Sequence, residues 1–367
     1  MTRILLVAGA RPNFMKIAPI VRECTKRASE IEYTIIHTGQ HYDSGMSDVF
    51  FEELNIPKPE FHLHVGSGTH TEQTAQIMLK FAPICEQVSP DSVVVVGDVN
   101  STVACSLVAK KMNLHVSHVE AGLRSGDKGM PEEINRIVTD AISDLHFVTE
   151  PSGVDNLRKE GHSEDSIHFV GHVMVDNLLY ENQRLEQSPL ESAASNIGEK
   201  LKKYGVVTLH RPSNVDDKAV LKGIVGALNS IAEKLPLIFP VHPRTKSNLD
   251  KFGISLASNI FPLNPLGYKE FLTLWRNAEI VLTDSGGLQE ETTALGVDCI
   301  TIRENTERPI TIEQGTNLLA GIEPEKIRAC FDRVMTKDRS SAQNLPDLWD
   351  GRASERIVDV LVSNLSG

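Results

Sequence analysis

The sequence lacks the features of a secreted, membrane-spanning or nucleic-acid-binding protein. Its five cysteines are odd in number and form no CxxC pair, so we expect reduced thiols in the cytoplasm. No apolar run approaches the ~18 residues of a membrane span, and the short run at residues 4–10 is followed at once by Arg11. The net charge of −12 argues against nucleic acid or an anionic membrane as a partner. We therefore expect a soluble, untargeted protein.

Motifs for a bound cofactor or metal are also missing. The loop after the first expected strand reads GARPNFMK and lacks the GxGxxG fingerprint, so it gives no support for a bound dinucleotide. Carboxylates and histidines can bind Mg²⁺ or Mn²⁺, but the sequence has no D-x-D pair and its 13 histidines are scattered. The sequence therefore predicts a site that works without metal or cofactor.

Short β-type runs alternate with helical segments along the whole chain of 367 residues. Their near-continuous apolar character predicts parallel sheets that helices cover on both faces. The expected strands are residues 4–7, 33–37, 92–96, 115–119, 145–148, 167–170, 206–209, 237–241, 260–263, 280–282, 299–302 and 317–319. These are too many for one doubly wound sheet. The pattern favours an α/β protein of two Rossmann-like domains, with a ligand cleft between them at the carboxyl ends of the strands. A (β/α)₈ barrel fits less well, because a polar helical stretch at residues 171–203 interrupts the series.

The stretch TDSGGLQEE, residues 283–291, is the most informative motif. It follows an apolar strand and opens a helical segment that stops at Gly296, so several free N–H groups of the helix point at one place. Such a turn favours an anion such as phosphate, and Gly286 and Gly287 allow a ligand to approach the backbone closely. The alternative is a plain helix cap by Asp284 or Ser285. The motif ends in two glutamates, and a carboxylate there, such as that of Glu291, can accept hydrogen bonds from ribose hydroxyls. The motif therefore suggests a nucleotide-sugar site.

Three carboxylates stand where they can take part in proton transfer. Asp98 and Glu120 follow apolar strands, and Glu132 lies in an expected helix with a buried face of Ile134, Ile137, Val138, Ala141 and Ile142. Capping by Asp98 and a surface ladder of Glu132, Arg136 and Asp140 are the alternatives. If they were brought together, the three carboxylates would raise one another's pKa values and supply both an acid and a base near neutral pH.

Cations and histidines at other strand ends complete the set of candidate residues. Arg11 and Lys16 can contact a phosphate or the substrate, or can be a solvated helix end. His210 and His242 follow successive strands, where either can be an ordinary hydrogen-bonded loop residue.

Nine motifs, in this order, resemble the UDP-N-acetylglucosamine 2-epimerase family: GARPNFMK, TGQHYD, GDVNST, HVEAGLRS, PEEINR, HRPSNVD, PVHPR, TDSGGLQEE and RENTERP. The resemblance covers residues 4–320. It implies a glycosyltransferase-B-like fold whose terminal helix returns to the first domain, with domains at residues 1–170 plus 351–367 and 171–350. It also implies that UDP-N-acetylglucosamine (UDP-GlcNAc) and UDP-N-acetylmannosamine (UDP-ManNAc) interconvert for surface polysaccharide synthesis, and it suggests a homodimer.

Roles for single residues follow from the same resemblance. In the family the C2 proton is removed and UDP leaves C1, giving 2-acetamidoglucal, and UDP then adds back after reprotonation on the other face. The family's acid–base and catalytic positions fall on Asp98, Glu120, Glu132 and His210. Its substrate contacts fall on Arg11, Lys16, Ser285, Gly286, Gly287, Glu291 and Arg308.

Two departures from the family pattern leave alternatives open. The chain reads Gln40-His41-Tyr42-Asp43 where members with a regulatory UDP-GlcNAc site carry a longer motif, and Ser213 stands where many members have Glu. A 2-epimerase of a 2,3-diacetamido uronic acid and a hydrolysing relative that releases UDP therefore remain possible readings. A retaining glycosyltransferase shares the fold but does not need three carboxylates, and a nucleotide-sugar sensor has no use for them.

Overall fold

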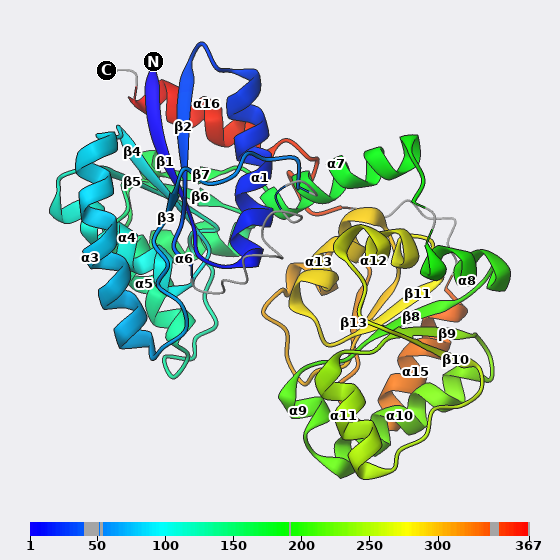
Figure 1. The fold of residues 1–367 in the computed structure, drawn as a ribbon. Coiled ribbons are helices and arrows are strands. Elements are labelled where there is room, and N and C mark those ends of the chain that lie inside the picture. The colour runs from blue at the N-terminus through cyan, green and yellow to red at the C-terminus, as the bar shows by residue number, and fades with distance from the viewer. Residues whose placement is uncertain (40–50, 52–53, 191, 338–344, 366–367) are drawn as a thin grey trace. The chain divides into compact units, whose positions relative to one another are not determined.

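The computed structural model describes residues 1–39, 51, 54–190, 192–337 and 345–365, except for the side chains of 11 and 193–195. Contacts divide the chain into two compact units, unit 1 (Met1–Asn177 and Asp347–Gly367) and unit 2 (Leu178–Pro346). Each unit is an α/β sandwich around a parallel sheet (Figure 1). In the part of the chain that the structure describes, no helix has the length and apolarity needed to cross a membrane.

The sheet of unit 1 has the strand order β3-β2-β1-β4-β5-β6-β7, and all its pairs are parallel. Its central strands are buried on both faces because helices cover both. The strands are β1 (Thr2–Ala8), β2 (Ile31–His37), β3 (Phe61–His62), β4 (Ser92–Val96), β5 (His115–Val119), β6 (Leu145–Val148) and β7 (Ile167–Phe169).

The helices of unit 1 form two layers on its sheet. Helices α1 (Arg11–Lys26) and α16 (Ala353–Leu365) pack together on one side, and α3 (His70–Val88), α4 (Asn100–Lys111) and α5 (Pro131–Ile142) lie side by side on the other (Figure 1). Arg27, which directly follows α1, reaches Asp359 of α16 at 2.5 Å. The expected return of the terminal helix to the first domain is therefore confirmed. The other helices among the described residues of unit 1 are α6 (Pro151–Lys159), the 3₁₀ helix η1 (Glu164–Ser166) and α7 (Val173–Gln187), which runs into unit 2.

Unit 2 repeats the plan with the strand order β10-β9-β8-β11-β12-β13, again all parallel. Its core is apolar and includes residues of α10, α15 and the central strands. The strands are β8 (Gly205–Thr208), β9 (Leu237–Pro240), β10 (Ile260–Leu263), β11 (Ile280–Thr283), β12 (Cys299–Thr301) and β13 (Asn317–Leu319). The helices are α8 (Ala193–Leu201), α9 (Pro212–Val215), α10 (Lys218–Ala232), α11 (Pro243–Phe252), α12 (Tyr268–Trp275), α13 (Gly286–Leu295), α14 (Ile310–Glu313) and α15 (Pro324–Met335).

Every strand expected from the sequence is present, and among the residues that the structure describes one further strand was missed. The missed strand is β3, which has two residues and pairs only with β2 at the edge of the sheet. Pro57 and Pro59 precede it, and so short a run directly after two prolines carries too little periodicity to be recognised.

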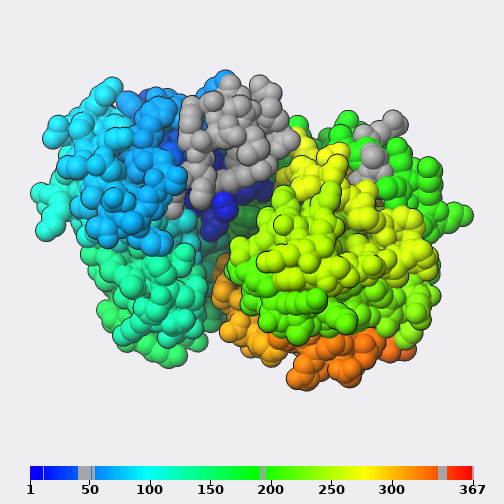
Figure 2. All heavy atoms as spheres, turned by 60° about the horizontal axis from the view of Figure 1, so that its bottom comes forward, coloured from blue at the N-terminus to red at the C-terminus, as the bar shows by residue number. Residues whose placement is uncertain are grey.

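The expected buried face of α5 is wrong. None of its apolar residues on this face is buried: Ile134 is 51% exposed, Ala141 is exposed, and Ile137, Val138 and Ile142 are half-buried. The buried residues of the helix are Glu133, Asn135, Arg136, Thr139 and Asp140. The polar side chains face inward because they bind the loops that follow β4 and β5. Figure 2 shows the blue-to-teal part of the chain, which includes α3 to α5, at the surface of unit 1.

Unit 1 should lose stability when the pH falls from 6.5 to 4. Burial, with His62 and His64 nearby, lowers the pKa of His37 from 6.5 to about 4. Between these values the unfolded chain binds a proton that the folded chain rejects, so the stabilisation is complete above pH 6.5 and falls by about 3 kcal/mol towards pH 4. Urea unfolding at several pH values measures this slope. His37→Phe should flatten it, and an equal slope in the variant would contradict the assignment.

Candidate functional site

The turn between β11 and α13 has glycines that the protein's own packing does not require. Gly286 and Gly287 are not among the residues with positive φ. A Cβ at Gly287 would meet no described atom within 4 Å, and one at Gly286 would only approach Arg211 Nη2 at 3.9 Å. Close approach of a ligand to the backbone explains why glycine stands at both positions, since a side chain would occupy the ligand's space. The free N–H groups at the start of α13 favour an anionic ligand.

Neither Asp284 nor Ser285 caps α13 with its side chain, so the alternative of a plain helix cap is wrong for this turn. Ser285 occupies the N-cap position of α13 but its side chain makes no capping hydrogen bond. The Asp284 carboxylate is buried and accepts instead from the β8–α9 turn, with the amides of His210 and Arg211 at 3.0 and 2.9 Å. Burial acts to raise the pKa of Asp284, but the hydrogen bonds from His210 and Arg211 outweigh it and lower the pKa. Asp284 therefore carries a negative charge.

A pocket of about 310 Å³ lies at this turn, within unit 2. It is lined by Thr208, His210, Tyr268, Phe271, Ser285, Gly287, Leu288 and Glu291. The structure thus brings together His210, Ser285, Gly287 and Glu291 from the predicted set. The Tyr268 hydroxyl donates to Glu291 at 3.3 Å. Sequence reasoning missed Tyr268 and Phe271, whose only signal was an aromatic pair at helical spacing after Gly267.

Arg308 and His242 have partners that the sequence did not suggest. Arg308 Nε lies 2.6 Å from Glu290 Oε1, so the two glutamates of the motif differ in role: Glu290 binds this arginine and Glu291 lines the pocket. His242 caps α11, because its Nδ1 accepts from the Arg244 amide at 3.2 Å. Its ring centroid lies 5.9 Å from that of His210.

In unit 1, Lys16 and Glu120 form an ion pair at the carboxyl ends of β1 and β5. Glu120 is 5% exposed and has φ of 69°, an unusual backbone conformation for a residue with a side chain. Gly97, with φ of 68°, passes next to the pair, since a Cβ there would lie 2.8 Å from Lys16 Nζ and 3.5 Å from Glu120 Oε2. The turn that carries Asp98 is therefore adjacent to the Lys16–Glu120 pair.

Asp98 does not cap α4, whose N-cap is Val99. Its Oδ2 lies 2.5 Å from Arg136 Nη2 on α5, and its carbonyl accepts from Asn135 Nδ2 at 2.8 Å. Arg136 also binds Glu133 at 3.0 Å, so the alternative of a surface ladder of Glu132, Arg136 and Asp140 is wrong.

Glu132 lies on the first turn of α5 and is half-buried. Asn135 and Arg136 are site residues that sequence reasoning missed. Among the described residues, no group of three His, Cys, Asp or Glu side chains is placed to hold a metal ion.

A buried histidine–aspartate pair supports both loops of unit 1. His118 Nδ1 lies 2.6 Å from Asp140 Oδ1, and its Nε2 lies 2.8 Å from the carbonyl of Gly97. Asp140 Oδ2 also accepts from the Gly122 amide at 3.0 Å and lies 2.7 Å from Arg124 Nη2. Burial acts to raise the pKa of Asp140, but His118 and Arg124 outweigh it and lower the pKa to about 2.

Comparison with known proteins agrees with the motifs at these strand ends. The family model of UDP-N-acetylglucosamine 2-epimerases matches residues 22–362, which contain most of the residues described above. The chain belongs to the UDP-N-acetylglucosamine 2-epimerase family.

Relatives in the family align over nearly the whole chain. The UDP-N-acetylglucosamine 2-epimerase of Methanocaldococcus jannaschii is 43% identical over 365 residues, covering 98% of each chain. The UDP-2,3-diacetamido-2,3-dideoxy-D-glucuronate 2-epimerase of Pseudomonas aeruginosa is 38% identical over 363 residues, covering 98% of this chain and 99% of its own.

A solved structure of the family has the same fold. The M. jannaschii UDP-GlcNAc 2-epimerase in complex with UDP-GlcNAc and UDP superposes with a TM-score of 0.83 at 41% identity, over 99% of this chain and 100% of its own. The expected glycosyltransferase-B-like class of two Rossmann-type units is thereby confirmed.

Two of the sequence predictions for this family member concern residues outside the structural description. Arg11 begins α1, but its side chain is not described. The motif Gln40-His41-Tyr42-Asp43 lies wholly outside the described residues.

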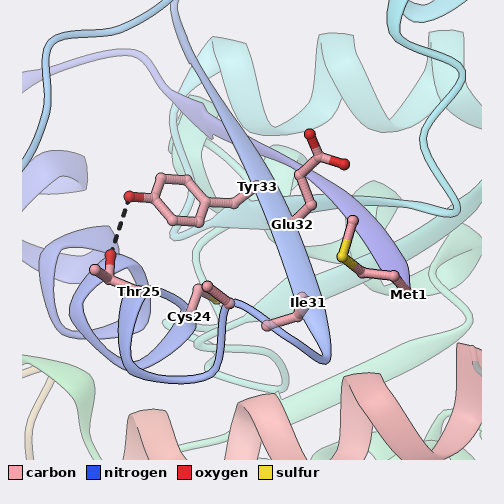
Figure 3. Close-up of a pocket in the computed structure, with 7 residues that line it drawn as sticks. Met1, Cys24, Thr25, Ile31, Glu32 and Tyr33 are labelled. Atoms are coloured by element: carbon pink, nitrogen blue, oxygen red, sulfur yellow. Dashed lines mark hydrogen bonds between the residues drawn. The ribbon is translucent and has the colours of Figure 1, made fainter.

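A second pocket, of about 350 Å³, lies in unit 1 at the amino ends of the strands, opposite to the strand ends that carry Glu120 (Figure 3). It is lined by Met1, Cys24, Thr25, Ala28, Ile31, Glu32 and Tyr33, where β1 and β2 begin and α1 ends. Ligands of open α/β sheets bind at the carboxyl ends of strands, and none of the predicted site residues is here. The candidate site therefore remains at the strand ends that carry Glu120 and Ser285.

Proposed function

We propose that the protein interconverts UDP-GlcNAc and UDP-ManNAc by eliminating UDP and adding it back, without metal or nicotinamide. The observation that carries the proposal is the glycine turn, where open space beside Gly287 adjoins a pocket containing His210 and Glu291. The turn would bind the diphosphate, Glu291 the ribose, and the flat side chains of Tyr268 and Phe271 would pack on the base.

The carboxylates of unit 1 supply the proton chemistry in this proposal. Asp98, Glu120 and Glu132 would remove the C2 proton and return one to the other face, while Lys16 and Arg11 bind negative charge on the substrate. The C1–O bond breaks, and its electron pair leaves with UDP, so that 2-acetamidoglucal forms. UDP must then stay bound until C2 is reprotonated. The glycine turn and Arg308 would serve this retention, which separates epimerisation from hydrolysis.

One experiment tests the reaction directly. The purified protein is incubated with UDP-GlcNAc in D₂O and the products are followed by NMR. Deuterium at C2 together with UDP-ManNAc supports the proposal. Free UDP and ManNAc in equal amounts would identify a hydrolysing enzyme, and the absence of C2 exchange would exclude this substrate.

A second substrate deserves the same assay, because a relative 38% identical is named as an epimerase of UDP-2,3-diacetamido-2,3-dideoxy-D-glucuronate. Deuterium exchange at C2 of this sugar, with no exchange at C2 of UDP-GlcNAc, would identify it as the substrate. A glycosyltransferase would show no exchange with either sugar.

All five cysteines are free, which supports action in the cytoplasm, where nucleotide sugars for surface polysaccharides are made.

We also propose a homodimer formed through the outward face of α5. This face consists of Ile134 and Ala141, which are exposed, and Ile137, Val138 and Ile142, which are half-buried, whereas the polar side of the helix is buried. An apolar helix face turned to solvent is unfavourable in a monomer. A second copy is the proposed partner, because isologous pairing covers the same face on both chains.

Ile134→Glu should convert the dimer to a monomer, because a charge would have to be buried in the apolar interface. Light scattering coupled to gel filtration would then report a fall from twice the chain mass to the chain mass. Met335→Glu is the matched control, since Met335 is 42% exposed on α15 of unit 2. A monomeric wild type, or dissociation by Met335→Glu, would count against this interface.

A further inference from the structure

The Asp284 carboxylate joins two segments that are 74 residues apart in the chain. It is wholly buried and accepts from the His210 amide, the Arg211 amide and Asn214 Nδ2, the last at 3.2 Å. A fourth contact is to an imidazole ring, with His210 Nδ1 at 2.9 Å from Asp284 Oδ1. The three backbone and amide contacts would suffice to fix the β8–α9 turn. The contact with the imidazole goes beyond that purpose.

The contact with Asp284 determines which nitrogen of His210 is available to a ligand. Asp284 is ionised and can only accept, so Nδ1 of His210 must carry a hydrogen. The other ring nitrogen, Nε2, is then the one available to a ligand. His210 lines the pocket at the glycine turn and its side chain is 39% exposed, so a ligand can reach the ring.

Asp284 is also the residue directly before Ser285, where the anion-binding turn begins. Its amide donates to the carbonyl of Thr208 at 3.3 Å, which continues the pairing of β11 with β8. The ring of His210 and the amides of α13 are therefore held by one short, buried segment. Their spacing is fixed before any ligand arrives.

We propose that Asp284 is a positioning residue that orients the ring of His210, so that the protonated ring directs its Nε2–H at the oxygen of the departing diphosphate. This inference rests on the proposed function. When the C1–O bond breaks, its electron pair stays on that oxygen and adds negative charge there. The imidazolium neutralises part of this charge and needs no proton transfer to do so. Asp284 compensates the positive charge on the ring from the other side.

A purely structural role for Asp284 predicts something different. An asparagine at 284 keeps one oxygen to accept from the backbone amides, so the turn can persist without the negative charge. Orientation of His210 depends on an acceptor that cannot donate, and asparagine can present its NH₂ group to Nδ1 instead. Asp284→Asn therefore separates the two roles.

The first measurement reads the tautomer of His210 in the wild type and leaves Asp284 unchanged. Two-dimensional ¹⁵N–¹H spectra of the imidazole rings are recorded on the wild type at a pH where His210 is neutral, and its signals are identified by their loss in His210→Gln. The proton should be on Nδ1. A proton on Nε2 in the neutral ring would overturn the inference.

The second measurement compares Asp284→Asn with the wild type in the D₂O exchange assay. We expect kcat to fall by about 10²–10⁴-fold, while KM and the affinity for UDP change by no more than about threefold. Asp298→Asn is the matched control, because Asp298 is also a buried carboxylate but lies at the amino end of β12, whereas Asp284 follows the carboxyl end of β11, and Asp298 pairs with Lys337 at 3.1 Å. It should leave kcat within about threefold.

The possible outcomes are distinct. Unchanged kcat in Asp284→Asn, or a loss of UDP affinity as large as the loss of kcat, overturns the inference, because Asp284 would then be dispensable or only a brace for the turn. Wild-type protein that exchanges neither UDP-GlcNAc nor the diacetamido uronate defeats the proposed function, and with it the inference's role for Nε2. The wild-type tautomer still reports on the Asp284–His210 contact in that case.

Discussion

Replacing Glu120 by glutamine is expected to abolish deuterium exchange at C2 of UDP-GlcNAc while UDP still binds. Glutamine has nearly the same shape but cannot accept a proton from carbon at any useful rate. General acid–base catalysis contributes about 10²–10⁴-fold, and the fall in exchange should reach the upper part of that range. Glu120 is held at φ of 69° and paired with Lys16, which is a costly arrangement for a carboxylate without a function.

The measurement is the initial rate of C2 exchange by NMR, with UDP affinity determined in parallel by calorimetry. Asp98→Asn should behave in the same way, since Asp98 is on the turn adjacent to the Lys16–Glu120 pair. Glu164→Gln is the control, because Glu164 is 66% exposed on unit 1, where it pairs with Arg158 at 2.7 Å. Retained exchange in Glu120→Gln would remove Glu120 from the proton chemistry.

The fold could be predicted well from sequence because its signal is local. Each central strand is an apolar run bounded by turn residues, as in Ser92–Val96, and a strand buried on both faces needs nothing else. The edge strand at Phe61–His62 carries no such run, and it was missed. The face of α5 was misjudged for a different reason. Periodicity shows that a helix has two faces, but the direction of burial depends on what the neighbouring loops must bind.

The residues of the candidate site that could be predicted from the sequence are mainly those that follow the end of a strand. Asp98, Glu120, His210 and Ser285 each follow a strand, and parallel strands deliver such residues to one edge of their sheet. Their partners come from distant segments and carry no local mark. Arg136, which binds Asp98 across 38 positions, looked like part of a helix ladder, and Asp284 looked like a cap. Residues that position others are found only when the chain is folded.

Unit 1 should be strongly destabilised by Asp140→Asn. Asp140 and His118 are fully buried, and Arg124 and the Gly122 amide converge on the same carboxylate. Removing the negative charge weakens the buried contact with the His118 ring and takes from Arg124 one of its two carboxylate partners, the other being Glu160, and breaking such a buried network typically costs about 3–5 kcal/mol. Because His118 also binds the carbonyl of Gly97, the loss should reach the turn that carries Asp98.

Urea unfolding measures this loss when the signal is specific to unit 1. Trp349 is buried in unit 1, and the other tryptophan, Trp275, is in unit 2, so fluorescence of a Trp275→Phe background reports unit 1 alone. Asp155→Asn is the control, since Asp155 is 64% exposed and its change should stay within about 0.5 kcal/mol.

The pH dependence of the same measurement identifies the charge of Asp140 as the cause. Its folded pKa is lowered from 3.8 to about 2, so the unfolded chain takes up the proton first as the solution is acidified. The stabilisation is therefore complete above pH 3.8 and is lost as the pH falls towards 2, by about 2–3 kcal/mol. The difference between wild type and Asp140→Asn should be constant from neutral pH down to about pH 4 and should shrink below it. A difference that stays the same down to the lowest pH would mean that shape, and not charge, makes Asp140 necessary to these loops.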